Sequence, residues 1–131
     1  MSLLLLHVSD SHLYDDPAGE LKGVRPLESY AAVLKSAHLN YPDPDVVVLG
    51  GDMAQDEAVV TYAKVAAMLP WCSPVMISPG NHANLPALRG ALIPALKACS
   101  SYSDHLALGP WQVTTISSCR AGSSSGFLAS D

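Results

Sequence analysis

Positive charge, cysteine and long apolar runs are all scarce in this chain of 131 residues. Its 7 Lys and Arg stand against 12 Asp and Glu, which gives a formal net charge of -5. This charge balance gives no reason to expect a basic surface that binds nucleic acid or an anionic membrane. The leading run 3–6 has no basic segment before it and is soon followed by Asp10, so we expect neither a signal peptide nor a membrane span. These shortages favour a cytoplasmic protein.

The three cysteines predict little chemistry of their own. Cys72, Cys99 and Cys119 are odd in number and show no C-x-x-C spacing, which argues against a disulfide framework and against a zinc knuckle. We expect each of them to be a small, buried, reduced side chain.

What the chain does contain is a regular alternation of apolar patterns. Consecutive apolar residues predict buried strands, apolar on both faces, at 3–9 and 45–49, and a third strand at 74–78. Helical spacing predicts helices at 26–40, 55–69 and 85–99, the last kinked or split by Pro94. Segments 105–108 and 111–116 predict a hairpin around Gly109-Pro110, and 122–126 is a Gly- and Ser-rich loop. The succession predicts a single α/β domain, 1–131, with a mainly parallel sheet and helical crossovers.

Three short polar motifs follow the three predicted strands: Asp10-Ser11-His12, Gly50-Gly51-Asp52 and Gly80-Asn81-His82. Taken singly, they are typical of a solvated turn, a helix cap or a surface imidazole. Because the carboxyl ends of parallel strands meet at one edge of a sheet, all three together predict a shared site. Carboxylate, imidazole and amide groups are suitable ligands for a divalent metal ion.

In this order the motifs resemble the Asp-x-His, Gly-Asp and Gly-Asn-His blocks of the calcineurin-like metallophosphoesterases. Two further stretches are most similar to the cyclic-nucleotide phosphodiesterase branch of this family. They are the sequence around Gly51-Asp52-Met53-Ala54 and a tail over 111–116 and 122–128. The resemblance implies a calcineurin-like layered α/β sandwich. It also implies an enzyme that hydrolyses a phosphodiester or phosphomonoester of a small molecule with divalent metal ions.

The resemblance also implies roles for single residues. Asp10 and His12 would hold a first metal ion, and Asp52 would bridge it to a second. Asn81 would bind the second ion and the phosphate, and His82 would protonate the leaving oxygen. One or two ions of Mn, Fe or Zn fit such ligands. Two cations stabilise charge in a phosphoryl displacement, and an acid with a near-neutral pKa suits the leaving group.

The chain departs from the family pattern in its second half. The family's later histidine blocks do not occur in these 131 residues, so the likeness covers the N-terminal portion of the family alone. Ala83 and Ser117 or Ser118 stand where acidic residues are usual. We expect a C-terminally truncated domain of weak activity. The alternative is a catalytically inactive domain that binds metal or phosphate, or acts only as an assembly module.

Three histidines lie outside the motifs. His7, within a strand, and His38, on a helix face, are expected to be packing or surface residues. His105 at the start of the hairpin is the remaining candidate to replace a missing ligand. A truncated sandwich would also expose apolar strand faces, so we expect a homodimer, with exchange of 104–131 between copies as one route.

Overall fold

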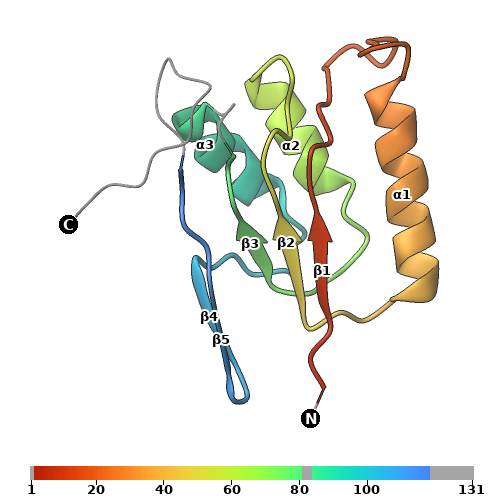
Figure 1. The fold of residues 1–131 in the computed structure, drawn as a ribbon. Helices are drawn as coiled ribbons and strands as arrows, with labels where there is room; N and C mark the ends of the chain where they lie inside the picture. Colours follow the sequence, from red (N-terminus) through yellow and green to blue (C-terminus); the bar gives the residue numbers. More distant parts are fainter. Residues whose placement is uncertain (1, 81–83, 119–131) are drawn as a thin grey trace.

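A short parallel sheet with helical connections forms the frame of the computed structural model, which describes residues 2–80 and 84–118. The elements in chain order are β1 (Leu5–Val8), α1 (Pro26–Asn40), β2 (Val46–Leu49), α2 (Val59–Ala67), β3 (Val75–Ile77), α3 (Leu85–Ala95), β4 (His105–Leu108) and β5 (Trp111–Thr114). Each predicted strand and helix is present, and the α/β class is confirmed (Figure 1).

The sheet has the order β1-β2-β3, and both strand pairs are parallel. Its register aligns Leu6 with Val47, and Val47 in turn with Val75. Beyond β3 the backbone continues the sheet for a few residues, because the Val75 amide donates to the Ser101 carbonyl at 2.7 Å. The hairpin β4–β5 is antiparallel and separate, as the sequence predicts. No helix among the described residues is long and apolar enough to cross a membrane.

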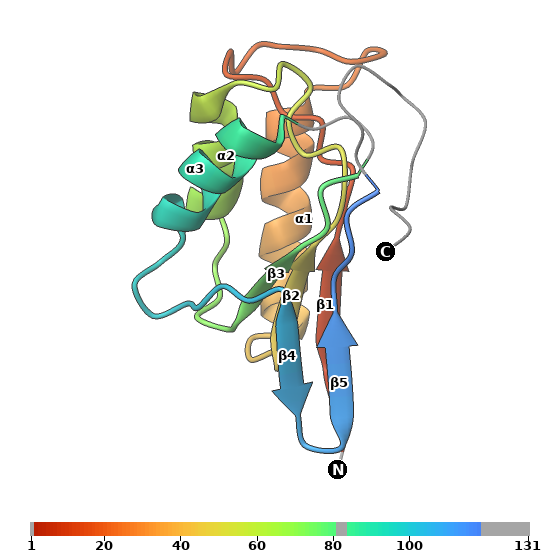
Figure 2. The ribbon, with the colours of Figure 1, turned by 90° about the vertical axis from the view of Figure 1, so that its left-hand side faces the viewer.

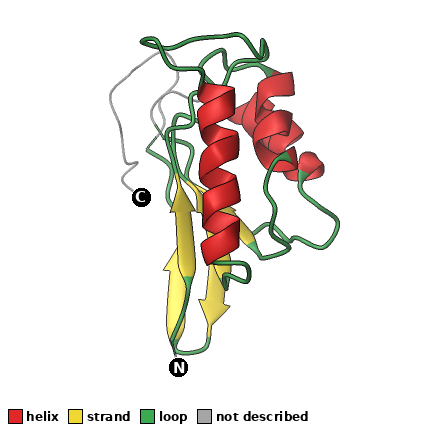
Figure 3. Ribbon diagram, turned by 90° about the vertical axis from the view of Figure 1, so that its right-hand side faces the viewer, coloured by secondary structure: helices red, strands yellow, loops and turns green. Residues whose placement is uncertain are grey.

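All three helices lie on one side of the parallel sheet (Figures 2 and 3). Residues Val47, Leu49, Val75 and Ile77 face them and are at most 4% exposed. β1 has only this side covered, and the exposed fraction of Leu5 is 40%. The prediction of a first strand buried on both faces is therefore wrong, because none of the three described helices covers the opposite face. On that face the ring of His7 lies over Gly50, where an added Cβ would come within 2.1 Å of His7 Nε2.

Two helices differ from the predicted ranges for local reasons. α1 occupies 26–40 as predicted, with Pro26 in its first turn. α2 begins at Val59 rather than at 55, because Glu57 has a φ of 52°, which a right-handed helix excludes. α3 ends at Ala95, one residue after Pro94, so the proline helps to end the helix rather than kinking a longer one.

The cysteine prediction is wrong for two of the three residues. Cys72 and Cys99 form a disulfide across 27 residues of chain, with Cα atoms 5.0 Å apart. It joins the loop before β3 to the segment after α3. Neither half of the pair follows a recognisable spacing, and only the fold brings them together. Cys119 lies outside the described residues.

Candidate metal centre

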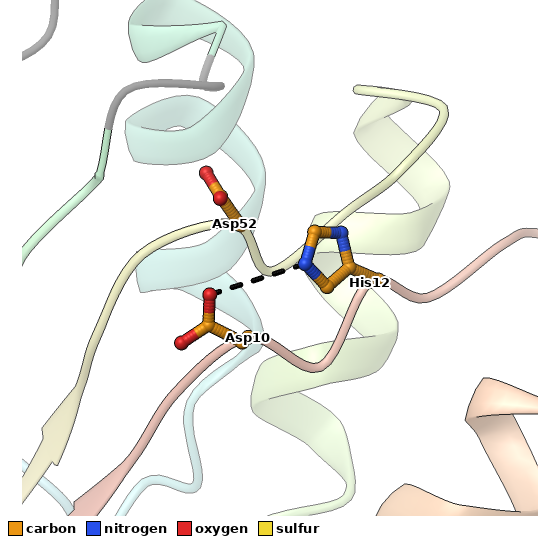
Figure 4. A group of neighbouring side chains, drawn as sticks. All are labelled: Asp10, His12 and Asp52. Atoms are coloured by element: carbon orange, nitrogen blue, oxygen red, sulfur yellow. Dashed lines mark ion pairs between the residues drawn. The ribbon is translucent and has the colours of Figure 1, made fainter. Parts of the chain in front are cut away.

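Three of the predicted ligands converge where β1 and β2 end. Asp10, His12 and Asp52 each offer one ligand atom, and these atoms lie within 4.8 Å of one another. Figure 4 shows the three side chains gathered between the two loops that follow the strands. Among the described residues this is the one group of three or more acidic, histidine or cysteine side chains close enough to share an ion.

Backbone hydrogen bonds join the loop after β1 to the loop after β2 and continue the pairing of the two strands beyond the sheet. The amide of Asp10 donates to the Gly51 carbonyl at 2.9 Å, and that of His12 donates to the Asp52 carbonyl at 3.0 Å. The amide of Leu13 then donates to the Met53 carbonyl, also at 2.9 Å. The ladder fixes which residues of the two loops are neighbours, and its pair Leu13 and Met53 is anchored in the core.

All three ligands have a left-handed backbone, with φ of 55° at Asp10, 45° at His12 and 50° at Asp52. L-residues adopt this conformation at a cost of about 1–2 kcal/mol. On a continuing strand, side chains two residues apart such as Asp10 and His12 would point the same way, but β1 ends at Val8. Their side chains converge because the backbone turns sharply at each ligand. Backbone strain of this kind is concentrated at functional sites.

One imidazole nitrogen of His12 is oriented by a residue that sequence reasoning missed. His12 Nδ1 lies 2.7 Å from Gln55 Oε1, and an amide oxygen can only accept, so Nδ1 carries the proton. In the neutral imidazole this leaves the lone pair on Nε2, which lies 3.9 Å from Asp10 Oδ1. A hydrogen bond on the far nitrogen is the usual way that proteins fix a metal-binding tautomer. The donor set therefore fits a divalent cation.

The loops after β2 and β3 approach each other most closely at two glycines. A Cβ on Gly51 would lie 2.7 Å from the Gly80 Cα, and one on Gly80 would lie 2.9 Å from the Asp52 amide nitrogen. Gly80 also has a φ of 78°. This contact brings the start of the third motif against Asp52. Asn81 and His82 themselves lie outside the described residues, so their positions stay a prediction.

Two pockets flank His12. The first, which we call the α1 pocket, has a volume of about 240 Å³. Its lining includes Asp10, Ser11, His12, Val24, Tyr30 and Val33. The second, which we call the turn pocket, has a volume of about 350 Å³. It is lined by His12, Leu21, Lys22, Asp52, Ala54, Gln55 and Glu57. A group bound at the three ligands has space on either side.

Asp56 ties the loop after His12 to the loop after Asp52. Its carboxylate accepts from the Asp15 amide at 2.8 Å, the Ala58 amide at 3.1 Å and the Thr61 hydroxyl at 2.9 Å. Burial works to raise the pKa of Asp56, but these hydrogen bonds outweigh it and lower the pKa below the ordinary value. The carboxylate is thus a structural acceptor beside the site rather than an acid.

His105 does not join the three ligands. Its Nδ1 lies 2.7 Å from Thr114 Oγ1 across the hairpin, and the hairpin extends away from the ends of β1 and β2 (Figure 1). His38 packs edge to face on Trp71, with ring centroids 6.1 Å apart. Gln55 carried no signal in the sequence, because only the loop-to-loop ladder shows that it reaches His12.

Comparison with known proteins identifies the lineage of this site. The family described as calcineurin-like phosphoesterase matches residues 3–128. The chain is 34% identical over 128 residues to the 3',5'-cyclic adenosine monophosphate phosphodiesterase CpdA of Haemophilus influenzae, covering 95% of this chain and 45% of that protein. It is 35% identical over 89 residues to CpdA of Escherichia coli K12, covering 67% and 32% of the two chains.

A third relative, CpdA of Pseudomonas aeruginosa, is 26% identical over 131 residues, which are 99% of this chain and 47% of that protein. The chain thus spans less than half the length of these curated relatives. The match nevertheless includes all three motifs and both loops of the metal centre. On this evidence the chain belongs to the calcineurin-like phosphoesterase family.

Proposed function

We propose that this protein is a metal-dependent phosphoesterase whose first cation is held by Asp10, His12 and Asp52. The observation that carries the proposal is the convergence of one atom from each side chain within 4.8 Å at the ends of two parallel strands. The side-chain exposure of Asp10 is 63% and that of His12 is 29%, so the cation site is open to a substrate from solution.

We propose residues 1–131 as a single domain.

In this proposal Asn81 and His82 complete the site. Both directly follow Gly80, which contacts Gly51, and the family resemblance gives Asn81 to a second cation and to the phosphate. His82 would donate a proton to the leaving oxygen. Bound cations would supply charge stabilisation for an in-line displacement at phosphorus. Manganese, iron and zinc all suit these ligands.

The proposed substrate is a small phosphodiester. Three relatives are named as phosphodiesterases of 3',5'-cyclic adenosine monophosphate, so this compound is the first to assay beside a general bis-aryl phosphodiester. Expected activity requires added manganese and is lost with a chelator. In His82→Ala the rate should fall by about a hundredfold or more while metal content is retained. Hydrolysis that is indifferent to both chelator and His82 would contradict the proposal.

A catalytically inactive metal-binding domain is the second candidate. It is favoured by Ala83, which stands where the family resemblance implies an acidic residue. The same assay separates the two: manganese binding with no hydrolysis of either phosphodiester supports the inactive domain.

We also propose that the chain associates as a homodimer, with exchange of 104–131 as one route. The support is the uncovered sheet face and the hairpin: Leu5 is 40%, Trp111 56% and Ile116 65% exposed. Among the described residues nothing pairs with the outer edge of β1, and exposed apolar edges are association surfaces. Light scattering after size exclusion should give twice the monomer mass. A monodisperse monomer at micromolar concentration would refute the dimer.

A further inference from the structure

A tight turn projects beside the metal ligands. Leu21 and Val24 exchange two backbone hydrogen bonds, of 2.8 and 3.0 Å, around the central residues Lys22 and Gly23. Both central residues have positive φ, 50° and 80°, which is the signature of a type I′ turn. Glycine and asparagine favour this conformation, and lysine does not. Lys22 is therefore an exception to the local preference at the tip of the turn.

Lys22 lines the turn pocket together with His12 and Asp52. It is the only cationic residue among those that line it. Within the described part of the chain, Lys22 makes no ion pair and no side-chain hydrogen bond. Two other basic side chains near the turn, by contrast, have partners. Arg25 pairs with Glu28 at 3.1 Å, and Lys64 donates to the Asp15 carbonyl at 2.8 Å.

The segment that carries the turn is tied down at both ends. On one side the Asp15 amide donates to Asp56, and Lys64 pairs with the Asp15 carboxylate at 3.6 Å. On the other side Arg25 pairs with Glu20 at 3.6 Å, across the base of the turn. These contacts, each exposed and modest alone, restrain the position of the turn beside the pocket.

We propose that Lys22 is a substrate-positioning residue that binds the phosphate group of the ester held at the metal centre. The inference rests on the proposed function and extends it to a residue that none of the three motifs contains. Asp52 and Glu57 also line the pocket, so an anion enters it only when a cation offsets their charge. Lys22 then adds a donor from the side of the pocket formed by the turn, and its charge-assisted hydrogen bond orients the ester.

The sharpest variant is Lys22→Asn. Asn-Gly is a preferred dipeptide for a type I′ turn, so this change removes the charge while keeping or improving the turn. Lys22→Arg keeps the charge. Lys35→Gln is the matched control, because Lys35 lies on α1 and lines neither pocket at the metal centre. Calorimetric titration of the full chain with inorganic phosphate, after loading with manganese, measures the affinity directly.

We expect Lys22→Asn to weaken phosphate binding by roughly three- to tenfold. Its melting temperature and its manganese-induced thermal shift should equal those of the parent or exceed them. Lys22→Arg and Lys35→Gln should bind phosphate as the parent does. For any ester that is hydrolysed, Lys22→Asn should raise KM more than it lowers kcat.

Equal phosphate affinity in Lys22→Asn and the parent would overturn the inference and leave the proposed metal centre intact. A parent protein that binds no phosphate with manganese present would overturn it as well. The manganese-induced shift of the parent reports on the metal centre by itself, so failure of the proposed function is recognised independently of Lys22.

Discussion

The two ends of the parallel sheet are built in opposite ways. At the carboxyl end, beyond β1 and β2, three polar residues share a left-handed backbone and surround open pockets. At the amino end, a disulfide joins Cys72 to Cys99, and the Trp71 indole donates to the Tyr41 carbonyl at 2.9 Å. One end has a strained backbone at three candidate ligands that are exposed or half-buried, and the other is joined by a disulfide and a side-chain hydrogen bond.

The difference teaches that the site depends on backbone contacts rather than on depth of burial. The loops of the carboxyl end are positioned by a hydrogen-bonded ladder and by the approach of Gly51 to Gly80. The amino end adds stability that the site itself does not supply. We therefore expect changes at the two ends to separate metal affinity from global stability.

The largest expected stability effect is at the amino end. Replacing both cysteines, Cys72→Ser with Cys99→Ser, removes a cross-link that closes a loop of 27 residues. Chain entropy gives such a loop about 3.5 kcal/mol of unfolding free energy. Urea denaturation should report a loss of that order, while manganese affinity stays that of the parent. A large loss of manganese affinity in the double variant would break the distinction between the two ends.

A smaller loss is expected from Gly51→Ala. Its Cβ would lie 2.7 Å from the Gly80 Cα, so the two loops must move apart at a cost of about 1–3 kcal/mol, and manganese affinity should fall too. Gly90→Ala in α3 is the matched control, because nothing lies within 4 Å of that Cβ and a helical alanine stabilises by about 0.5–1 kcal/mol. Thermal unfolding measures the stability of both variants. Equal stability of Gly51→Ala and Gly90→Ala would contradict the close contact between Gly51 and Gly80.

The smallest effect is expected from Asp56→Asn. The pKa of Asp56 is lowered from its ordinary value of 3.8, because hydrogen bonds from Asp15, Ala58 and Thr61 outweigh the opposing effect of burial. A lowered folded-state pKa stabilises the fold above pH 3.8, and this contribution disappears as the pH falls through the folded value. The exposed carboxylate contributes less than about 1 kcal/mol. Denaturation at a series of pH values gives the free energy of unfolding of Asp56→Asn and of the parent. The difference between these two energies should be constant near neutrality and should become smaller below pH 3.8.

Apolar pattern and motif position predicted most of the architecture. The range 26–40 and the hairpin around Gly109-Pro110 follow from periodicity and turn residues that act locally. The start of α2 could not be predicted, because Glu57 is excluded from the helix by the geometry of the loop before it. The disulfide could not be predicted, because Cys72 precedes β3 and Cys99 follows α3, and only the folded chain brings the two cysteines together.

The site shows the same division. The strand-end rule predicted that Asp10, His12 and Asp52 converge, and one atom of each lies within 4.8 Å of the others. The contribution of Gln55 depends on a 2.7 Å contact between two loops, and no spacing along the chain encodes it. Local motifs thus predicted which side chains converge, and the supporting residues required the structure.

The central claim is that the three converging side chains bind a divalent cation, and the manganese-dependent rise in melting temperature tests it most directly. A ligand that binds only the folded state raises this temperature, and the rise grows with the logarithm of ligand concentration above the dissociation constant. Asp52→Asn keeps a residue that tolerates the left-handed backbone and removes one ligand charge. Asp45→Asn is the control at the amino end, where Asp45 Oδ2 accepts from the Leu4 amide at 2.8 Å. We predict a concentration-dependent rise in the parent and in Asp45→Asn, and none in Asp52→Asn. An equal rise in Asp52→Asn, or no rise in the parent, would contradict the account.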